Sequence, residues 1–289
     1  MNTKKTYTHK TIVQLMLIFF VLGLSFDAHT QDMKFDPKGN PEKWNFSITP
    51  FLILPWVSGN VQSEMLSQDF GIDPADFINS LNGTFMINTE LSKGKFFVAP
   101  SYIYLHNQVS KILWTSQNGN QTITAEPAMQ KHIMELIAGM RFRLGTKFML
   151  DPYLGFRYTM YHLFGSVQGI GNTTEIDENV DFWDPVLGFR AHFYPHPRIP
   201  IELKADIGGF GVGSKLTWST WFNVGYSVSP TVDLLAGFAA LSNQYESETA
   251  SGRTYGMTSL TYGISIGARF FIPSRAKDPG VFKKFSRED

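Results

Sequence analysis

Residues 187–207 read LGFRAHFYPHPRIPIELKADI, and this stretch decides the fold. Apolar residues occupy every second position on both sides of the His196-Pro197-Arg198 tripeptide, and charged residues lie between them. A period of two is the pattern of β-strands, and a proline-containing tripeptide between two such segments is typical of a tight turn. The stretch therefore predicts a β-hairpin with one apolar face and one charged face.

The same alternation recurs on both sides of this hairpin. It predicts an all-β chain with a single domain of about ten strands, with about eight to twelve possible. The alternating segments cover residues 44–54, 84–91, 96–104, 136–144, 154–160, 187–193, 201–207, 218–226, 232–240 and 262–270.

Short and long connections alternate strictly between these segments. Tight turns are expected at 93–94, 145–147, 196–198 and 229–231, and longer connections at 58–82, 106–131, 165–180, 208–214 and 242–258. An antiparallel up-and-down transmembrane β-barrel has short turns at one rim and long loops at the other, whereas a Greek-key sandwich has no reason for this order. The alternation therefore predicts such a barrel, with both of its ends at the rim of short turns.

Charged residues lie opposite the apolar stripe of the central strands. On the lipid side of a barrel, a basic residue at the membrane midplane costs ~2–4 kcal/mol. We therefore expect these side chains to point inward, to pair with one another and to fill much of a narrow lumen. The predicted lumen charges are Arg141, Arg143, Arg157, Arg190, Glu202, Lys204, Asp206, Asp233 and Arg269.

The composition agrees with a membrane sheet and excludes several other classes. Charged residues make up 17% of the chain, against about 25% in an ordinary soluble domain. The 25 Lys and Arg residues balance the 25 Asp and Glu residues, so no basic field exists to bind nucleic acid. The chain has no cysteine, which excludes disulfides, lipoprotein anchoring and thiolate metal sites. No metal site and no cofactor are predicted.

The N-terminus predicts export. Three lysines, Lys4, Lys5 and Lys10, precede an apolar run over 12–26, and small residues follow at Ala28-His29-Thr30. This is the order of charges, apolar core and cleavage site in a secretory signal peptide. We expect a signal peptide at 1–30 cleaved near Thr30, an N-terminal segment at 31–43, the barrel at 44–273 and a polar C-terminal tail at 274–289.

Three motifs resemble a family of uncharacterised Gram-negative outer-membrane β-barrel proteins. The first is W-x-F-S-x-T-P-F, which begins at Trp44. The second is W-D-P-x-x-G-x-R from Trp183, and the third is D-x-G-G-F-G-x-G-S from Asp206. The segment from Ser265 to Ile272 further resembles the last-strand signal that the barrel-assembly machinery recognises. The resemblance implies an outer-membrane location and a barrel, with no reaction or ligand.

These observations favour an outer-membrane barrel of unassigned activity, structural or porin-like and small-solute related, with a charge-paired and largely plugged lumen. Its expected partners are outer-membrane lipid and the barrel-assembly machinery during biogenesis, and its oligomeric state is left open. The first alternative is a membrane-embedded lipid-modifying enzyme, an acyl hydrolase or transferase, for which His162 near Ser166 is the nearest candidate group. The second alternative is a soluble periplasmic β protein.

Overall fold

The computed structural model describes residues 44–63, 66–75, 81–108, 111–115, 122–168, 173–248 and 254–272. The predicted signal peptide, the N-terminal segment and the polar tail lie outside the described residues. Within these ranges, no helix has the length and apolar character needed to cross a membrane.

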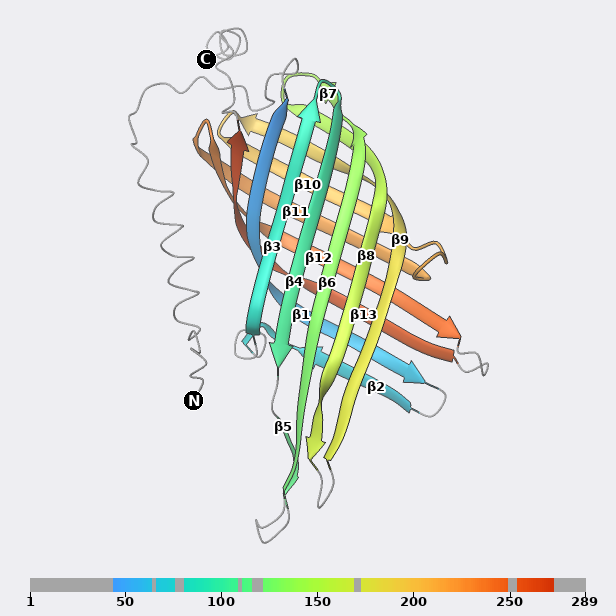
Figure 1. Ribbon diagram of the computed structural model, residues 1–289. Coiled ribbons are helices and arrows are strands. Elements are labelled where there is room, and N and C mark those ends of the chain that lie inside the picture. The colour runs from blue at the N-terminus through green and yellow to red at the C-terminus, as the bar shows by residue number, and fades with distance from the viewer. Residues whose placement is uncertain are drawn as a thin grey trace, which may run out of the picture.

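Ten antiparallel strands form a closed barrel (Figure 1). Each wall strand pairs with the next one along the chain, and β13 pairs with β1 from Phe46↔Ile272 to Gln62↔Gly256, which closes the ring. The prediction of a single up-and-down antiparallel barrel of about ten strands is therefore confirmed. The wall strands are β1 (Asn45–Ser63), β3 (Leu81–Lys93), β4 (Phe96–Gln108), β6 (Thr122–Met140), β8 (Phe148–Gln168), β9 (Thr173–His196), β10 (Ile199–Gly208), β11 (Leu216–Ser229), β12 (Val232–Glu248) and β13 (Thr254–Ile272).

Three further strands extend this wall. β2 (Leu66–Ile72) folds back on β1, β5 (Lys111–Thr115) folds back on β6, and β7 (Phe142–Leu144) pairs with β8 just after β6 ends. β2 and β5 lie in segments expected to be long connections. The alternation missed them because Gln68 interrupts the apolar alternation of β2, and three adjacent apolar residues, 112–114, remove the period-two signal in β5.

The tight turns share one end of the barrel, the upper end in Figure 1, with the first and last wall residues, Asn45 and Ile272. Gly94 and Gly145 have φ angles of 61° and 76°, in the left-handed region that favours glycine. These two turns therefore depend on their glycines. We call this rim the short-turn end.

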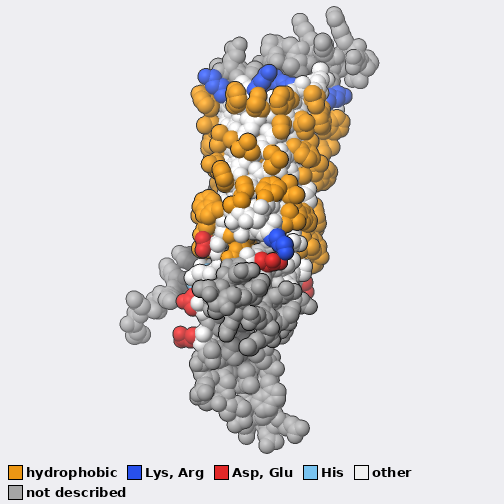
Figure 2. All heavy atoms as spheres, turned by 90° about the vertical axis from the view of Figure 1, so that its right-hand side faces the viewer, with side chains coloured by type: hydrophobic (Ala, Val, Ile, Leu, Met, Phe, Trp, Pro, Cys, Tyr) orange, Lys and Arg blue, Asp and Glu red, His pale blue; other side chains and the backbone are white. Residues whose placement is uncertain are grey.

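The outer surface of the barrel is apolar. Large hydrophobic side chains are exposed on every wall strand, among them Phe96 at 66%, Leu154 at 64% and Trp183 at 58%. Figure 2 shows them as a broad band between Lys and Arg side chains at the short-turn end and charged side chains of both signs beyond its other edge. Apolar surface of this extent is unfavourable in water and suits contact with lipid chains. We call it the apolar belt.

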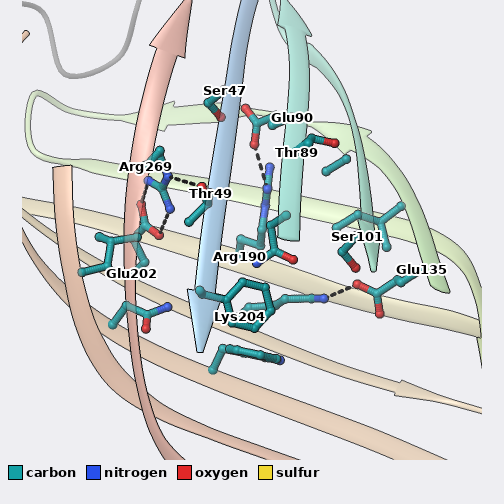
Figure 3. Close-up of a pocket in the computed structure, with 18 of the residues that line it drawn as sticks. Ser47, Thr49, Thr89, Glu90, Ser101, Glu135, Arg190, Glu202, Lys204 and Arg269 are labelled. Carbon is teal, nitrogen blue, oxygen red and sulfur yellow. Dashed lines mark hydrogen bonds and ion pairs between the residues drawn. The ribbon is translucent and has the colours of Figure 1, made fainter. Parts of the chain in front are cut away.

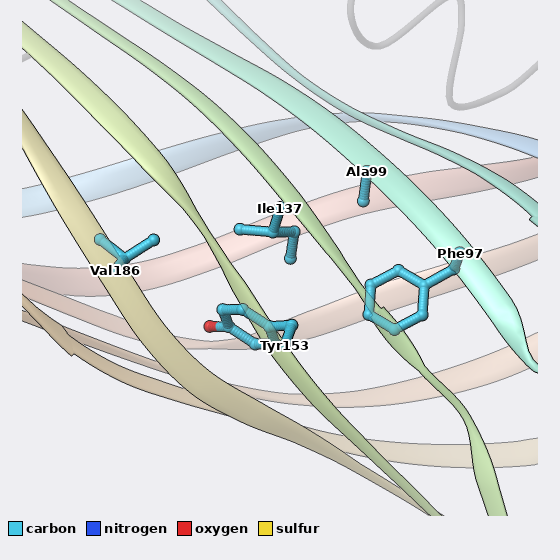
Figure 4. Packing of buried hydrophobic residues seen from close by; sticks show 5 residues of the cluster. All are labelled: Phe97, Ala99, Ile137, Tyr153 and Val186. Atoms are coloured by element: carbon cyan, nitrogen blue, oxygen red, sulfur yellow. The ribbon is translucent and has the colours of Figure 1, made fainter.

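The interior of the barrel is packed with side chains. Near the short-turn end, one buried cluster joins residues from β4, β6, β8 and β9 (Figure 4). A second cluster joins β1, β3, β4 and β12, and a third joins β8, β9 and β13 farther from the short turns. Their buried members are Phe97, Ala99, Ile137, Tyr153 and Val186 in the first, Ile53, Met86, Leu105 and Ala239 in the second, and Tyr161, Phe182 and Met257 in the third.

Candidate functional site

Charged side chains from six wall strands meet inside the barrel. They occupy the alternate positions opposite the apolar belt, so the pleat of each strand directs them inward. We call them the lumen charge network. Its members are Glu90 on β3, Glu135 on β6, Arg141 just after β6, Asp151 and Arg157 on β8, Arg190 and His192 on β9, Glu202, Lys204 and Asp206 on β10, and Arg269 on β13.

Two arginines and two carboxylates form a ring of ion pairs across the lumen. Arg141 Nη2 lies 3.0 Å from Glu90 Oε1 and 2.8 Å from Asp151 Oδ2. Arg190 bridges the same two carboxylates: it lies 2.8 Å from Glu90 (Figure 3) and 3.0 Å from Asp151. Because β3 and β9 are separated by β4, β6 and β8 around the ring, the Arg190–Glu90 pair spans the interior and does not follow the wall.

An aromatic ring supports these arginines. The guanidinium carbon of Arg190 lies 4.0 Å from the centroid of the Phe97 ring, and that of Arg141 lies 5.8 Å from it. Phe97 is 2% exposed and belongs to the buried cluster of Figure 4. Each guanidinium therefore has carboxylates at its edge and a π-face beside it, and both contacts are electrostatically favourable.

A second group of charges centres on Arg157. Its Nη2 lies 2.8 Å from Asp206 Oδ1, and its Nε and Nη2 both donate to Glu135 Oε2. Lys204 makes a further ion pair with Glu135. Asp206 also accepts hydrogen bonds from two hydroxyls that the charge pattern did not predict, Tyr153 at 2.9 Å and Ser219 at 2.6 Å. Both carboxylates of this group are thus paired and hydrogen-bonded.

His192 links the first ring to a third pair. Its Nε2 lies 3.1 Å from Asp151 Oδ2, and its Nδ1 lies 3.5 Å from Glu202 Oε1. Glu202 accepts from both terminal nitrogens of Arg269, with Nη2 at 2.6 Å. One chain of contacts therefore runs from β3 through β8, β9 and β10 to β13.

The structure brings most of the predicted charges together, buries Asp233 beside Arg269 and leaves Arg143 outside the lumen. Asp233 stands opposite Arg269 in the β12–β13 register and accepts a hydrogen bond from Ser227 Oγ at 2.5 Å. Arg143 was expected inside the lumen, but its side chain is exposed at the short-turn end. Arg143 occupies an inward position of β7, between Phe142 and Leu144. However, β7 lies at the rim, beyond the enclosed interior. The predicted members that lie within the network are Arg141, Arg157, Arg190, Glu202, Lys204, Asp206 and Arg269.

Four members of the network were missing from the predicted set. Glu135 lies between Met134 and Leu136, which are outward and exposed, so the period-two pattern contained the signal for it. Glu90 is the second-last residue of the alternating segment 84–91, and Asp151 precedes the segment 154–160. The alternation therefore says little about the direction of either side chain. The fourth, His192, was left out because the formal charge counts histidine as neutral, but it occupies an inward position of β9, as Arg190 does.

A cavity of about 200 Å³ lies beside the network. Figure 3 shows Glu90, Arg190, Lys204, Glu135 and the Arg269–Glu202 pair around it. Other parts of its lining are apolar, including Phe51, Ile103, Ile133 and Trp221. The cavity therefore has both polar and apolar groups in its lining. Within the described residues, no three His, Asp or Glu side chains are grouped so that they could hold a metal ion.

The candidate catalytic pair of the lipid-enzyme alternative, His162 and Ser166, lies on one face of β8, at alternate positions four residues apart. His162 Nε2 pairs with Asp177 Oδ1 at 2.7 Å on the outward phase of β8, and its ring lies 4.7 Å from that of Phe164. The neighbouring Thr159 and Tyr161 are buried in the lumen. The wall of the barrel thus separates His162 from these two hydroxyls. Ser166 is on the same face as His162, but four residues of extended strand place their backbones roughly 13 Å apart. The geometry therefore does not form a nucleophile–base pair from these residues.

Two of the motifs that carry the family resemblance are in contact. The backbone N–H of Ser214 donates to Asp184 Oδ1 at 2.6 Å, and its hydroxyl donates to Oδ2 at 2.8 Å. Ser214 ends the glycine-rich connection between β10 and β11, and Asp184 lies on β9. A Cβ at Gly213 would overlap the carbonyl oxygen of Trp183, so only glycine fits there. We infer that these motifs have a structural role, since they fix the connection against β9.

The fold and the filled interior define a class, the closed antiparallel barrels typified by bacterial outer-membrane proteins. Neither a known protein-family model nor a curated protein matches the sequence. Among solved structures, the chain is similar to the outer-membrane protease OmpT from Escherichia coli, with 10% identity, a TM-score of 0.50 and coverage of 81% of this chain and 98% of that one. At this identity the likeness shows the fold alone.

Two other solved barrels are less similar. The translocator domain of the autotransporter NalP from Neisseria meningitidis has 9% identity and a TM-score of 0.39, and covers 91% of this chain and 98% of its own. Ail, the attachment invasion locus protein of Yersinia pestis in complex with a heparin analogue, has 12% identity and a TM-score of 0.30, and covers 77% of this chain and 99% of its own.

Proposed function

We propose that this chain is an outer-membrane β-barrel protein with a closed lumen, a structural or small-solute-related barrel and not an open porin. The observation that carries the proposal is the Arg190–Glu90 ion pair, which joins opposite parts of the wall at 2.8 Å. An open porin keeps a continuous aqueous path along its axis, and side chains that contact one another across the lumen interrupt such a path.

Contacts at two other heights support the closed lumen. Phe51 on β1 meets Trp221 on β11, with ring centroids 5.3 Å apart in an edge-to-face arrangement. Farther from the short turns, the Tyr161 hydroxyl on β8 lies 3.2 Å from Ser259 Oγ on β13. Asn243 on β12 donates to the same tyrosine at 3.2 Å. Side-chain contacts therefore cross the interior at three heights: near the short turns, in the middle and near the long hairpins.

The apolar belt supports the membrane location. A closed sheet pairs its backbone groups internally, so it can face lipid when its outer side chains are apolar. In the proposed orientation the short turns face the periplasm and the long hairpins face outward, as is usual for such barrels. Cleavage of the signal peptide near Thr30 and assembly by the barrel-assembly machinery belong to the same proposal.

Replacing Leu154 by arginine tests the membrane location. Leu154 is 64% exposed in the middle of the apolar belt. If lipid covers the belt, Leu154→Arg should lower the free energy of unfolding by about 2–4 kcal/mol, because the guanidinium enters the bilayer. The measurement is urea unfolding of the full chain folded into phosphatidylcholine vesicles.

Leu154→Met is the matched control for this substitution. It keeps an apolar side chain of similar volume and should cost less than about 1.5 kcal/mol. In a soluble protein an arginine at so exposed a position would change stability by only about 0.5 kcal/mol. Equal stability of the arginine and methionine variants, together with recovery of the chain in the soluble fraction, would therefore refute the membrane location.

A further inference from the structure

Within the described residues, the backbone pairing of the barrel wall is interrupted between β1 and β3. These strands pair only from Asn45↔Ser92 to Pro50↔Ile87. Beyond Pro50, β1 continues along β13 and its far part pairs with β2, while β3 continues along β4. Figure 1 shows β1 and β3 side by side at the short-turn end and diverging from there. We call the stretch bounded by residues 51–56 of β1 and 81–86 of β3 the seam.

Two prolines of β1 lie at the seam. Pro50 is the last residue of β1 paired with β3, and Pro55 follows within the seam. Proline has no backbone N–H, and residues five positions apart on a strand direct this group to opposite neighbours, so one of the two prolines removes a donor on the β3 side. Proline within a sheet is normally confined to edges and bulges, and this part of β1 has the character of a sheet edge.

Apolar side chains lie directly behind the seam. Ile53 on β1 and Met86 on β3 belong to one buried cluster, and Phe51 packs against it. Ile103 and Trp221, which also pack against this cluster, line the 200 Å³ cavity together with Phe51. Side chains alone therefore separate the seam from the cavity, since the backbone ladder is missing there.

The cavity limits the kind of molecule that could use this route. Its volume of about 200 Å³ is below the roughly 300–1,000 Å³ of pockets for drug-sized ligands, which leaves room for one short chain and not for a two-chain lipid. The polar lining beyond the charge network includes Asn223 and Ser265, which are hydrogen-bonded to each other at 3.2 Å. The five basic groups of the network already contact carboxylates, so a charged head would leave a charge uncompensated.

We propose that the seam admits a single-chain amphiphile with an uncharged head, such as a medium-chain alcohol, from the surrounding lipid into the lumen cavity. Its alkyl chain packs against Phe51, Ile103 and Trp221, and its head hydrogen-bonds to polar groups in the cavity lining. This binding step rests on the proposed membrane position of the apolar belt and goes beyond the closed barrel described above.

Two tryptophans on β11 provide a matched pair of reporters. Trp221 faces the cavity, whereas Trp218 is three positions away on the opposite face, in the apolar belt. Full-length variants that keep only one of the six tryptophans isolate each signal. The probe is ω-bromo-undecanol added to vesicles containing the folded protein, because bromine quenches tryptophan fluorescence on contact.

A second pair of variants tests the route. Because the chain has no cysteine, Leu52→Cys with Phe85→Cys can be joined across the seam by a short bismaleimide. Leu52→Cys with Ile266→Cys, on the continuous β1–β13 ladder, is the matched control. We expect saturable quenching of Trp221, slowed about tenfold or more by the seam bridge and unchanged by the control bridge. The bromo-carboxylic acid of the same length should need a roughly tenfold higher concentration.

The outcomes separate this inference from the proposed function. Quenching of Trp218 without quenching of Trp221 would leave the membrane barrel intact and overturn the inference. Equal quenching rates in the seam-bridged and control-bridged proteins would also overturn it, because the probe would then arrive along the axis. Equal potency of the acid would refute the uncharged head. Loss of Trp218 quenching would instead contradict the membrane position itself.

Discussion

Replacing Arg157 by methionine is expected to lower the free energy of unfolding by about 3–5 kcal/mol. Arg157 is 2% exposed and joins Glu135 on β6 to Asp206 on β10. Methionine keeps an unbranched apolar stem but lacks the guanidinium, so Asp206 would lose its arginine and Glu135 would keep only Lys204. The cost comes chiefly from these buried carboxylates, which cannot recover the hydration they had in the unfolded chain.

Urea unfolding in vesicles measures this cost, and two other variants serve as controls. Lys215→Met removes one partner of the exposed Lys215–Glu246 pair and should cost less than about 1 kcal/mol. Adding Asp206→Asn to Arg157→Met removes the one excess negative charge and keeps the Lys204–Glu135 ion pair, so it should recover a large part of the loss. A cost for Arg157→Met as small as that of Lys215→Met would mean that the network is hydrated, which contradicts a closed lumen.

Replacing Phe97 by alanine is also expected to lower the free energy of unfolding by about 3–5 kcal/mol. The substitution opens a cavity within the cluster of Phe97, Ala99, Ile137, Tyr153 and Val186 (Figure 4). It also removes the ring that lies against Arg190 and Arg141. The loss should therefore exceed that of an outward phenylalanine, and it should appear as a lower temperature at which the folded band disappears in heat-modifiability gels.

Phe96→Ala is the matched control because Phe96 precedes Phe97 on β4 and points outward, with 66% of it exposed. Removing it leaves no cavity, since lipid can fill the space, and the expected cost is less than half that of Phe97→Ala. Similar costs for the two variants would mean that the two faces of β4 are equivalent. That result would contradict a barrel whose inner face is packed with side chains and whose outer face contacts lipid.

The barrel itself could be predicted because the sequence of each central strand has one apolar face and one polar face. In residues 201–207, apolar Ile201 and Leu203 alternate with Glu202 and Lys204, and the structure places the first pair outward and the second inward. The short turns could also be predicted, because each depends only on a few neighbouring residues, and they indicated which strands follow one another in the sheet. The ends of the strands were less predictable, because hairpin arms that leave the apolar belt are polar on both faces and carry no period.

The partners within the lumen could not be predicted from the sequence. Arg190 and Glu90 are 100 residues apart, and their contact depends on the tilt and stagger of the closed sheet, which no single strand encodes. The seam escaped prediction for a related reason. The alternation of β1 continues through Leu52 and Leu54, and a strand's own pattern does not reveal whether its neighbour is paired.

Planar-bilayer conductance of the purified, folded chain tests the closed lumen most directly. An open porin inserted into the same bilayers in concentrated potassium chloride provides the positive control, and the vesicle assay with Leu154 variants confirms that the protein is inserted. We predict no steady conductance steps from the native protein, because the ion pairs around Arg190 and the contacts of Trp221 and Tyr161 cross its interior. Reproducible ohmic steps from the native protein, of the size given by a water-filled pore, would contradict the account.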